Sequence, residues 1–251
     1  MRLKGRYWAD VCSGTGPVSR ALRKLKVASR EWEYNHGPWG DVTQARNTRC
    51  LLADIRRRRC RGGMFAPPCG TFSNALFWTG RLRSQEEPWG KSRGLNDRQR
   101  EKVVDANRIT RAVLRLIKAM HAAGLPWVIE NPDSSLIWHL PYLRDIVLDK
   151  KVLVVKSDQC RYGRSWRKRT RFVCGNIDAD DLGRLAKTCA GTRGVCPHNG
   201  GAKHFQLQGA SPSGVLWTTI AAAYPPRMAA AIAHALTAAD FGREMNEGRR
   251  V

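Results

Sequence analysis

The apolar positions of this chain fall into two patterns that alternate along its length. Short apolar runs typical of buried strands occupy residues 7–11, 27–33, 64–66, 127–129, 152–155 and 170–174. Between them, apolar residues recur at helical spacing from about Pro17, after Val42, over residues 97–123, and from Pro226 to about Ala238. Strands that alternate with helices predict a doubly wound, Rossmann-like α/β sheet, whose ligands bind at the carboxyl ends of the strands.

Two stretches interrupt this alternation. Residues 70–96 are irregular and rich in Gly, Ser, Trp and Arg, and loops of such length are usually functional or disordered. Residues 177–214 are polar and Gly-rich, which indicates a small lobe or insertion. We therefore expect a core at 1–176, this lobe at 177–214, and a segment at 215–251 that returns to the core.

The charge balance points to a polyanionic partner. The chain has 44 Lys and Arg residues against 21 Asp and Glu residues, a formal net charge of +23. Such an excess repels itself in a compact protein, and nucleic acid is the usual partner that relieves it, although a merely solvated basic surface has the same composition. Arginine dominates the excess, and its planar fork suits phosphates and base edges.

The eight cysteines are irregularly spaced, and the chain enters its first strand without a signal peptide. We therefore expect an intracellular, reducing compartment, the cytoplasm or the nucleus, where cysteines serve as core residues, nucleophile or metal ligands. No apolar run reaches the length of a membrane span, and we expect a monomer without membrane contact.

The first strand runs into a glycine-containing turn. This turn allows the backbone to approach a ligand, and the following helix offers free N–H groups, so either a nucleotide-like cofactor site or a plain tight turn fits. An acidic residue at the end of the second strand favours the cofactor, because a carboxylate there can accept ribose hydroxyls; Glu31 is at about the right distance, with Glu33 on the same face. The turn residues are Asp10, Val11, Cys12, Ser13, Gly14, Thr15 and Gly16.

Two further strand ends carry reactive groups. Two prolines hold Cys69 rigidly behind the third strand, where it is either a nucleophile or a buried structural cysteine. Glu130 begins a Glu-Asn-Pro segment at another strand end and favours the nucleophile. A thiolate that attacks C6 of cytosine needs an acid at ring N3, and a glutamic acid in a partly apolar pocket can have a suitably raised pKa. This chemistry needs no metal.

These segments, in this order, resemble the DNA cytosine-5 methyltransferases, with the compact size of the forms found in bacteriophages and mobile elements. The resemblance implies a class I methyltransferase sheet that binds S-adenosylmethionine at residues 10–16, with Pro67 also in the cofactor site. It implies that Cys69 is the nucleophile and Glu130 the N3 acid. By the same resemblance, Glu31 meets the ribose and Asp41 the adenine amino group.

A later basic segment is similar to the family's Gln-x-Arg-x-Arg region. The resemblance implies that Arg169 and Arg171 hold the base and the backbone near the active site. The segment at 223–226, followed by an alanine-rich helix, resembles the family's closing motif. Three departures accompany these matches: Cys12 replaces an aromatic residue, Arg167 replaces the glutamine, and Ala222-Ala223 replaces Gly-Asn. The small lobe implies short or weak sequence readout of the target.

Because the chemistry requires both faces of the cytosine, the base must leave the duplex. The segment after Cys69 interleaves aromatic and basic residues, which fits either a lid over the flipped base or a disordered basic loop. Its aromatic residues are Phe72, Phe77, Trp78 and Trp89. We expect nucleic-acid contacts from this segment and the later basic one, at Ser73, Arg81, Arg83, Arg164, Arg167 and Lys168.

A group of potential soft ligands lies in the small lobe. Cys189, Cys196, His198 and His204 are close in sequence, with Cys160 and Cys174 upstream. A lobe with little apolar content often needs a structural ion such as zinc. The spacing matches no standard zinc finger, and unpaired cysteines with surface histidines remain the alternative.

Three functions are compatible with these residues. The leading hypothesis is a DNA cytosine-5 methyltransferase that uses S-adenosylmethionine. RNA methylation is the second, since one branch of the family modifies tRNA with the same residues and the basic charge suits both polymers. The third is a non-catalytic nucleic-acid-binding protein, which would have no chemical need for Cys69 or Glu130.

Overall fold

A six-stranded mixed sheet forms the centre of the computed structural model, which describes residues 5–73 and 80–247, with side chains up to residue 238. The strand order is β2-β1-β3-β4-β6-β5. Strand β6 runs antiparallel to the other five, which are parallel to one another. The strands are β1 (Tyr7–Val11), β2 (Ser29–Trp32), β3 (Cys60–Phe65), β4 (Trp127–Pro132), β5 (Val152–Asp158) and β6 (Arg169–Gly175). The predicted doubly wound α/β fold is confirmed.

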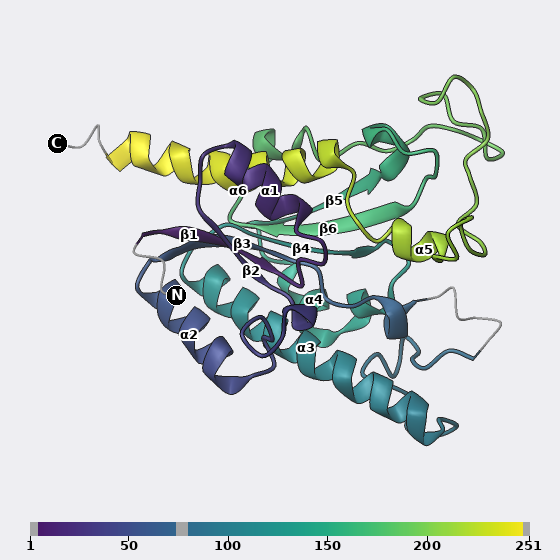
Figure 1. The fold of residues 1–251 in the computed structure, drawn as a ribbon. Coiled ribbons are helices and arrows are strands. Elements are labelled where there is room, and N and C mark those ends of the chain that lie inside the picture. The colour runs from purple at the N-terminus through teal and green to yellow at the C-terminus, as the bar shows by residue number, and fades with distance from the viewer. Residues whose placement is uncertain (1–4, 74–79, 248–251) are drawn as a thin grey trace.

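Helices cover both faces of this sheet (Figure 1). One face packs against α1 (Pro17–Lys24) and α6 (Pro226–Glu247), and the other against α2 (Ala45–Arg56), α3 (Asp97–Ala122) and α4 (Pro141–Ile146). A short helix, α5 (Trp217–Ile220), precedes α6. The 3-10 turns are η1 (Tyr34–His36), η2 (Gly70–Phe72), η4 (Leu136–His139), η5 (Gln159–Tyr162) and η6 (Asp180–Leu182).

Alternation along the strands produces two separate cores. In β1, Tyr7 and Ala9 face the core with α2 and α3, whereas Trp8 faces the core with α1 and α6. In β4, Ile129 and Val128 divide in the same way. Strands β1 and β4 are buried on both faces and therefore read as apolar runs, which is why the pattern revealed them.

The remaining elements follow from local sequence to different degrees. The long helix α3 starts at a capping box between Asn96 and Gln99 and is followed by Gly124 at φ +64°, as predicted. Strand β3 begins four residues earlier than expected, because Gly62 lets the sheet approach the Pro126 carbonyl and the Trp8 ring closely. Helix α4 was not predicted, since its single buried stripe is too short to show a period.

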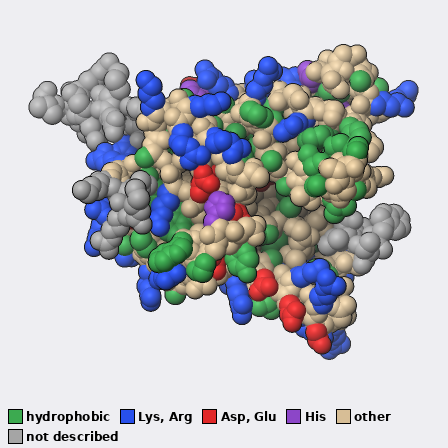
Figure 2. Space-filling view, in the orientation of Figure 1, with side chains coloured by type: hydrophobic (Ala, Val, Ile, Leu, Met, Phe, Trp, Pro, Cys, Tyr) green, Lys and Arg blue, Asp and Glu red, His purple; other side chains and the backbone are tan. Residues whose placement is uncertain are grey.

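Basic side chains are spread over the surface. Figure 2 shows many separate Lys and Arg side chains on the visible face, with several carboxylates at the lower right, where the amino-terminal end of α3 lies. None of the described helices is long and apolar enough to cross a bilayer.

Arg83 corrects one sequence-based prediction. Its side chain is fully buried, so it cannot reach a phosphate, and the prediction that it binds nucleic acid is wrong. The guanidinium donates to Thr71 Oγ1, the Pro88 carbonyl and Asn107 Oδ1 at 2.8–3.1 Å and lies 3.7 Å above the Phe72 ring. Burial lowers the pKa of Arg83 to about 10. Arg83 therefore attaches residues 80–96 to α3.

The same packing limits the expected lid. Phe72 is fully buried, so its ring is not available to an extruded base, and Trp89 is partly buried against the core. Phe77 and Trp78 lie outside the described residues.

Replacing Arg83 by Met should destabilise the protein strongly. Several buried acceptors would lose their donor, so we expect urea denaturation to show a loss of about 2–3 kcal/mol. The matched control is Arg93→Met at an exposed position, which should change the unfolding free energy by less than about 0.5 kcal/mol. Equal effects of the two substitutions would contradict the anchoring role of Arg83.

Candidate active site

The topology brings three of the singled-out segments to one edge of the sheet. The chain moves from β1 to β2 on one side and then crosses to β3 on the other, so a switch point lies between β1 and β3. The register pairs Val11 with Phe65 and Phe65 with Ile129. The glycine turn after β1, the Pro-Pro-Cys segment after β3 and the Glu-Asn-Pro end of β4 therefore lie side by side.

A hydrogen bond ties the second and third segments together. The buried amide of Asn131 donates from Nδ2 to the Pro67 carbonyl at 2.9 Å. Cys69 follows at the start of η2, half-buried. Burial raises the pKa of the Cys69 thiol, the charge of Glu130 raises it further, and Lys168 lowers it. Thiol, carboxyl and ammonium thus interact within one site.

Glu130 sits in a closed environment. It is 8 % exposed, and its Oε2 accepts a hydrogen bond of 2.7 Å from the Tyr224 hydroxyl. Burial raises the pKa of Glu130, against the opposing effects of Lys168 and Tyr224. Lys168 itself donates from Nζ to the Ala221 carbonyl at 2.7 Å. The segment before α6 therefore supports both charged groups of the site.

Tyr224 was missed in the sequence. The closing motif suggested only that the chain returns to the cofactor, and a single tyrosine beside two prolines carries no sign of its partner. Lys168 was expected to bind nucleic acid, but the structure places its charge beside Cys69 and Glu130.

The glycine turn has the backbone shape expected of it. Cys12, Gly14 and Gly16 have φ values of 58°, 55° and 69°, in the left-handed region that glycine adopts freely. The Gly14 N–H donates to Glu33 Oε2 at 2.8 Å. Ser13 is buried beside them, and its Oγ has no hydrogen-bond partner among the described residues.

Glu33, not Glu31, is the acid that bonds to the turn. Glu31 lies 3.3 Å from Arg23, and its carboxylate packs under Gly16, where an added Cβ would be 2.9 Å from Oε2. Glu33 is buried just beyond β2 and caps η1. The alternation of a strand places both acids on one face, so the sequence could not separate their roles.

Asp10 and Asp41 have protein partners. Asp10 Oδ2 accepts from the Ser19 N–H at 3.0 Å and the Ser19 hydroxyl at 2.9 Å, and burial raises its pKa to about 6. Asp41 accepts from the Thr43 N–H at 2.7 Å and from Gln44 at 3.0 Å. Burial would raise the pKa of Asp41, but these donors lower it overall.

The surroundings of Cys12 are acidic within a basic protein. Burial raises its pKa first, and the charges of Glu33, Asp10 and Asp41 raise it further. Such an acidic environment disfavours a phosphate and suits a ligand that offers hydroxyls, an amine or a positive charge.

The two arginines of β6 are held by carboxylates. Arg169 makes two hydrogen bonds of 3.1 Å with the fully buried Asp158. Arg171 donates to Asp133 at 2.8 Å and lies over the Trp138 ring.

The other predicted nucleic-acid contacts are spread over two regions. Arg167 contacts Asp158 at 3.3 Å, and Arg164 lies over Trp166. Ser73 and Arg81, half-buried, flank the undescribed residues 74–79.

The structure brings together three of the four potential soft ligands named from the sequence. Cys189, Cys196 and His204 converge, but His198 is exposed, with both its ring nitrogens beside Arg161 Nη1. Cys160 takes the fourth place.

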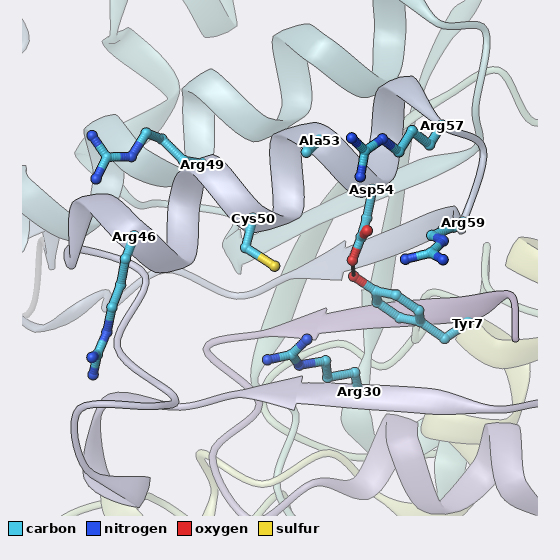
Figure 3. Close-up of a pocket in the computed structure, with 9 residues that line it drawn as sticks. All are labelled: Tyr7, Arg30, Arg46, Arg49, Cys50, Ala53, Asp54, Arg57 and Arg59. Carbon is cyan, nitrogen blue, oxygen red and sulfur yellow. Dashed lines mark hydrogen bonds between the residues drawn. The ribbon is translucent and has the colours of Figure 1, made fainter. Parts of the chain in front are cut away.

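Two cavities differ in position and charge. One, of about 550 Å³, adjoins the site between Pro68, Gly70 and the start of α3. The other, of about 330 Å³, lies at the opposite edge of the sheet (Figure 3). There the Tyr7 hydroxyl donates to Asp54 at 2.8 Å. The arginines that line this cavity are Arg30, Arg46, Arg49, Arg57 and Arg59.

No family model and no curated protein matches the chain. Similar solved structures include the Entamoeba histolytica methyltransferase EhMeth, with TM-score 0.41, 12 % identity and coverage of 70 % of this chain and 54 % of that chain. The S. pombe Dnmt2 methyltransferase has TM-score 0.41, 11 % identity and coverages of 73 % and 55 %. A Spodoptera frugiperda DNMT2 mutant has TM-score 0.40, 10 % identity and coverages of 68 % and 50 %. The chain spans about half the length of these structures, and at this overlap the likeness carries no argument about activity.

Replacing Lys168 by Met should make Cys69 less reactive at neutral pH. The ammonium lowers the pKa of the thiol, so its loss raises that pKa and shifts the pH dependence of iodoacetamide alkylation upward. Peptide mass spectrometry isolates the Cys69 rate from those of the other cysteines. Lys150→Met, at an exposed position, is the control that should leave the profile in place. A profile that shifts downward, or equally in both variants, would contradict the assignment.

Proposed function

We propose that this protein is a DNA cytosine-5 methyltransferase that uses S-adenosylmethionine. The observation that carries the proposal is the meeting of a thiol and a buried carboxyl with a raised pKa at the ends of adjacent parallel strands. A pure binding protein has no need for this pair. The sheet and the segment order agree with the family that the motifs resemble.

The chemistry follows from the two groups. The Cys69 thiolate forms a bond to C6 of an extruded cytosine, while Glu130 donates a proton to ring N3. This addition makes C5 nucleophilic. C5 would then take the methyl group from the sulfonium of the donor, which leaves as a thioether. Loss of the C5 proton to water re-forms the C5–C6 double bond and expels the thiolate, and ring N3 returns its proton to Glu130. Burial keeps Glu130 protonated to a higher pH than a solvated glutamate, which suits an acid.

The acidic turn fits the cofactor. S-adenosylmethionine supplies an electrophilic methyl group, and it carries a sulfonium and an ammonium but no phosphate. The three carboxylates around Cys12 suit such a ligand better than a dinucleotide. Glu33, with Glu31 nearby, would hold the ribose, and Asp41 would hold the adenine. The backbone at Gly14 and Gly16 would make the closest contacts with the cofactor. Pro67 would border the cofactor on the side of Cys69.

The assignment of a nucleic-acid substrate rests on charge and on the lobe. A net charge of +23 favours a polyanion, and the segment that carries Arg164, Arg167, Arg169 and Arg171 adjoins the site. Ser73 and Arg81 would approach the strand from the side of the nucleophile. Residues 177–214 would contact the target, with much of the affinity coming from phosphates.

A mechanism-based trap tests the nucleophile. With cofactor and a duplex that contains 5-fluorocytosine, the wild-type protein should form a denaturant-stable adduct, because fluorine at C5 blocks the final elimination. Cys69→Ser should form none, whereas Cys50→Ser, at an exposed position, should form it as the wild type does.

Running the trap with DNA and with RNA distinguishes the candidate substrates. An adduct with DNA alone supports the proposal. An adduct with 5-fluorocytosine RNA alone moves the activity to RNA, and no adduct with either polymer favours a non-catalytic binder and overturns the proposal.

Glu130→Gln tests the acid separately. The amide keeps the size of the side chain but cannot deliver a proton, so the single-turnover methylation rate should fall about 10²- to 10⁴-fold. Affinity for the DNA, measured by fluorescence anisotropy, should change much less. A near-normal rate in this variant would remove Glu130 from the chemistry.

A further inference from the structure

Four buried side chains converge beside the predicted lobe. Cys160 comes from η5, next to the sheet, and Cys189, Cys196 and His204 come from residues 177–214. One potential donor atom from each residue lies within 4.8 Å of the other three. The cluster is separate from the candidate active site, whose residues surround Cys69 and Cys12.

The spacing of the donors matches a tetrahedral ion. The distance from Cys189 Sγ to Cys196 Sγ is 3.9 Å, and from Cys189 Sγ to His204 Nε2 it is 3.6 Å. A tetrahedron with Zn–S of about 2.3 Å and Zn–N of about 2.0 Å has edges of about 3.8 and 3.5 Å. A disulfide would require a sulfur separation of about 2.05 Å and would leave two donors unused.

The histidine is already oriented for a metal. Its Nδ1 lies 2.9 Å from the Gly194 carbonyl, which can only accept, so Nδ1 carries the proton and Nε2 presents a lone pair to the sulfurs. The Gly191 N–H donates to Cys189 Sγ at 3.4 Å, as suits a thiolate. Gly191 is needed there, because a Cβ would be 2.0 Å from the Val195 carbonyl oxygen.

The part of the lobe after Leu185 has almost no other interior. From Ala186 to Ile220 the buried side chains are those of Cys189, Cys196 and His204, and all three belong to the cluster. A polypeptide segment without an apolar core needs another source of order, and a structural metal is a common one.

We propose that Cys160, Cys189, Cys196 and His204 bind one Zn²⁺ as a structural site. Four protein ligands close the coordination shell, so the ion would have no open position for catalysis. It would attach the lobe to the sheet through Cys160 and would order residues 186–204.

The cluster is joined to the basic segment by Asp158. This buried carboxylate accepts from the Cys189 N–H at 2.7 Å and from Arg169 at 3.1 Å. Arg167 in turn donates to the Cys189 carbonyl at 2.9 Å. Binding of the ion therefore fixes the orientation of Arg167 and Arg169.

Metal analysis of the full chain tests the site. Protein purified without chelator, or refolded with zinc, should contain one zinc per chain by plasma mass spectrometry. Cys196→Ser should lose most of it, whereas His198→Ala and Cys50→Ser, outside the cluster, should retain it. Chelation should expose residues 186–220 to limited proteolysis while the sheet stays protected.

Cobalt substitution keeps the test valid if the serine variant folds poorly. Co²⁺ in the wild-type protein should show the visible bands of a tetrahedral ion and a thiolate charge-transfer band in the near ultraviolet. His204→Cys should still bind, with a spectrum altered by a fourth sulfur. Folded wild-type protein that takes up neither metal after reduction, or that loses metal equally with His198→Ala, would overturn the proposal.

Discussion

The parallel pairing of β3 with β4 is the constraint on which the site depends. It sets Phe65 beside Ile129, so that the chain leaving each strand delivers one reactive group to the same edge. The bond from Asn131 to the Pro67 carbonyl then holds the two exits together. Prolines limit both segments, and the thiol and the carboxyl keep their relative position without a covalent link.

Burial at this edge of the sheet favours the proposed role of Glu130 and opposes that of Cys69. It raises the pKa of Glu130, which helps a proton donor, and it raises the pKa of Cys69, which hinders a thiolate. Lys168 lowers both pKa values, so one cation moderates both groups. In the acidic turn beside them, the carboxylates of Asp10 and Asp41 instead accept hydrogen bonds from Ser19 and Thr43.

Local pattern was enough to predict the strands, the longest helix and the strand-end motifs. Each of these is encoded within a few neighbouring residues, by a buried apolar run, a capping residue or a proline pair. The partners that complete the site are long-range. Tyr224 meets Glu130 across 94 positions, and Arg83 meets Asn107 across 24. Arginine is usually exposed, so only the packing of residues 80–96 on α3 reveals that Arg83 is structural. The sequence could not show that Cys160 belongs to the soft-ligand cluster and that His198 does not. The folding of the lobe decides which of its side chains point inward.

The contacts made by Tyr224 and Ala221 have a consequence for synthesis of the chain. Strands and helices that carry Cys69 and Glu130 leave the ribosome first, and these strands can pair before residues 221–236 exist. Until that segment docks, the face of the sheet later covered by α6 is exposed, Glu130 lacks its hydroxyl donor, and Lys168 lacks the Ala221 carbonyl. The contacts that stabilise Glu130 and Lys168 therefore form only after residues 221–236 have been synthesised. In a nascent chain the Cys69 thiol would lie beside an incomplete site until residues 221–236 have docked.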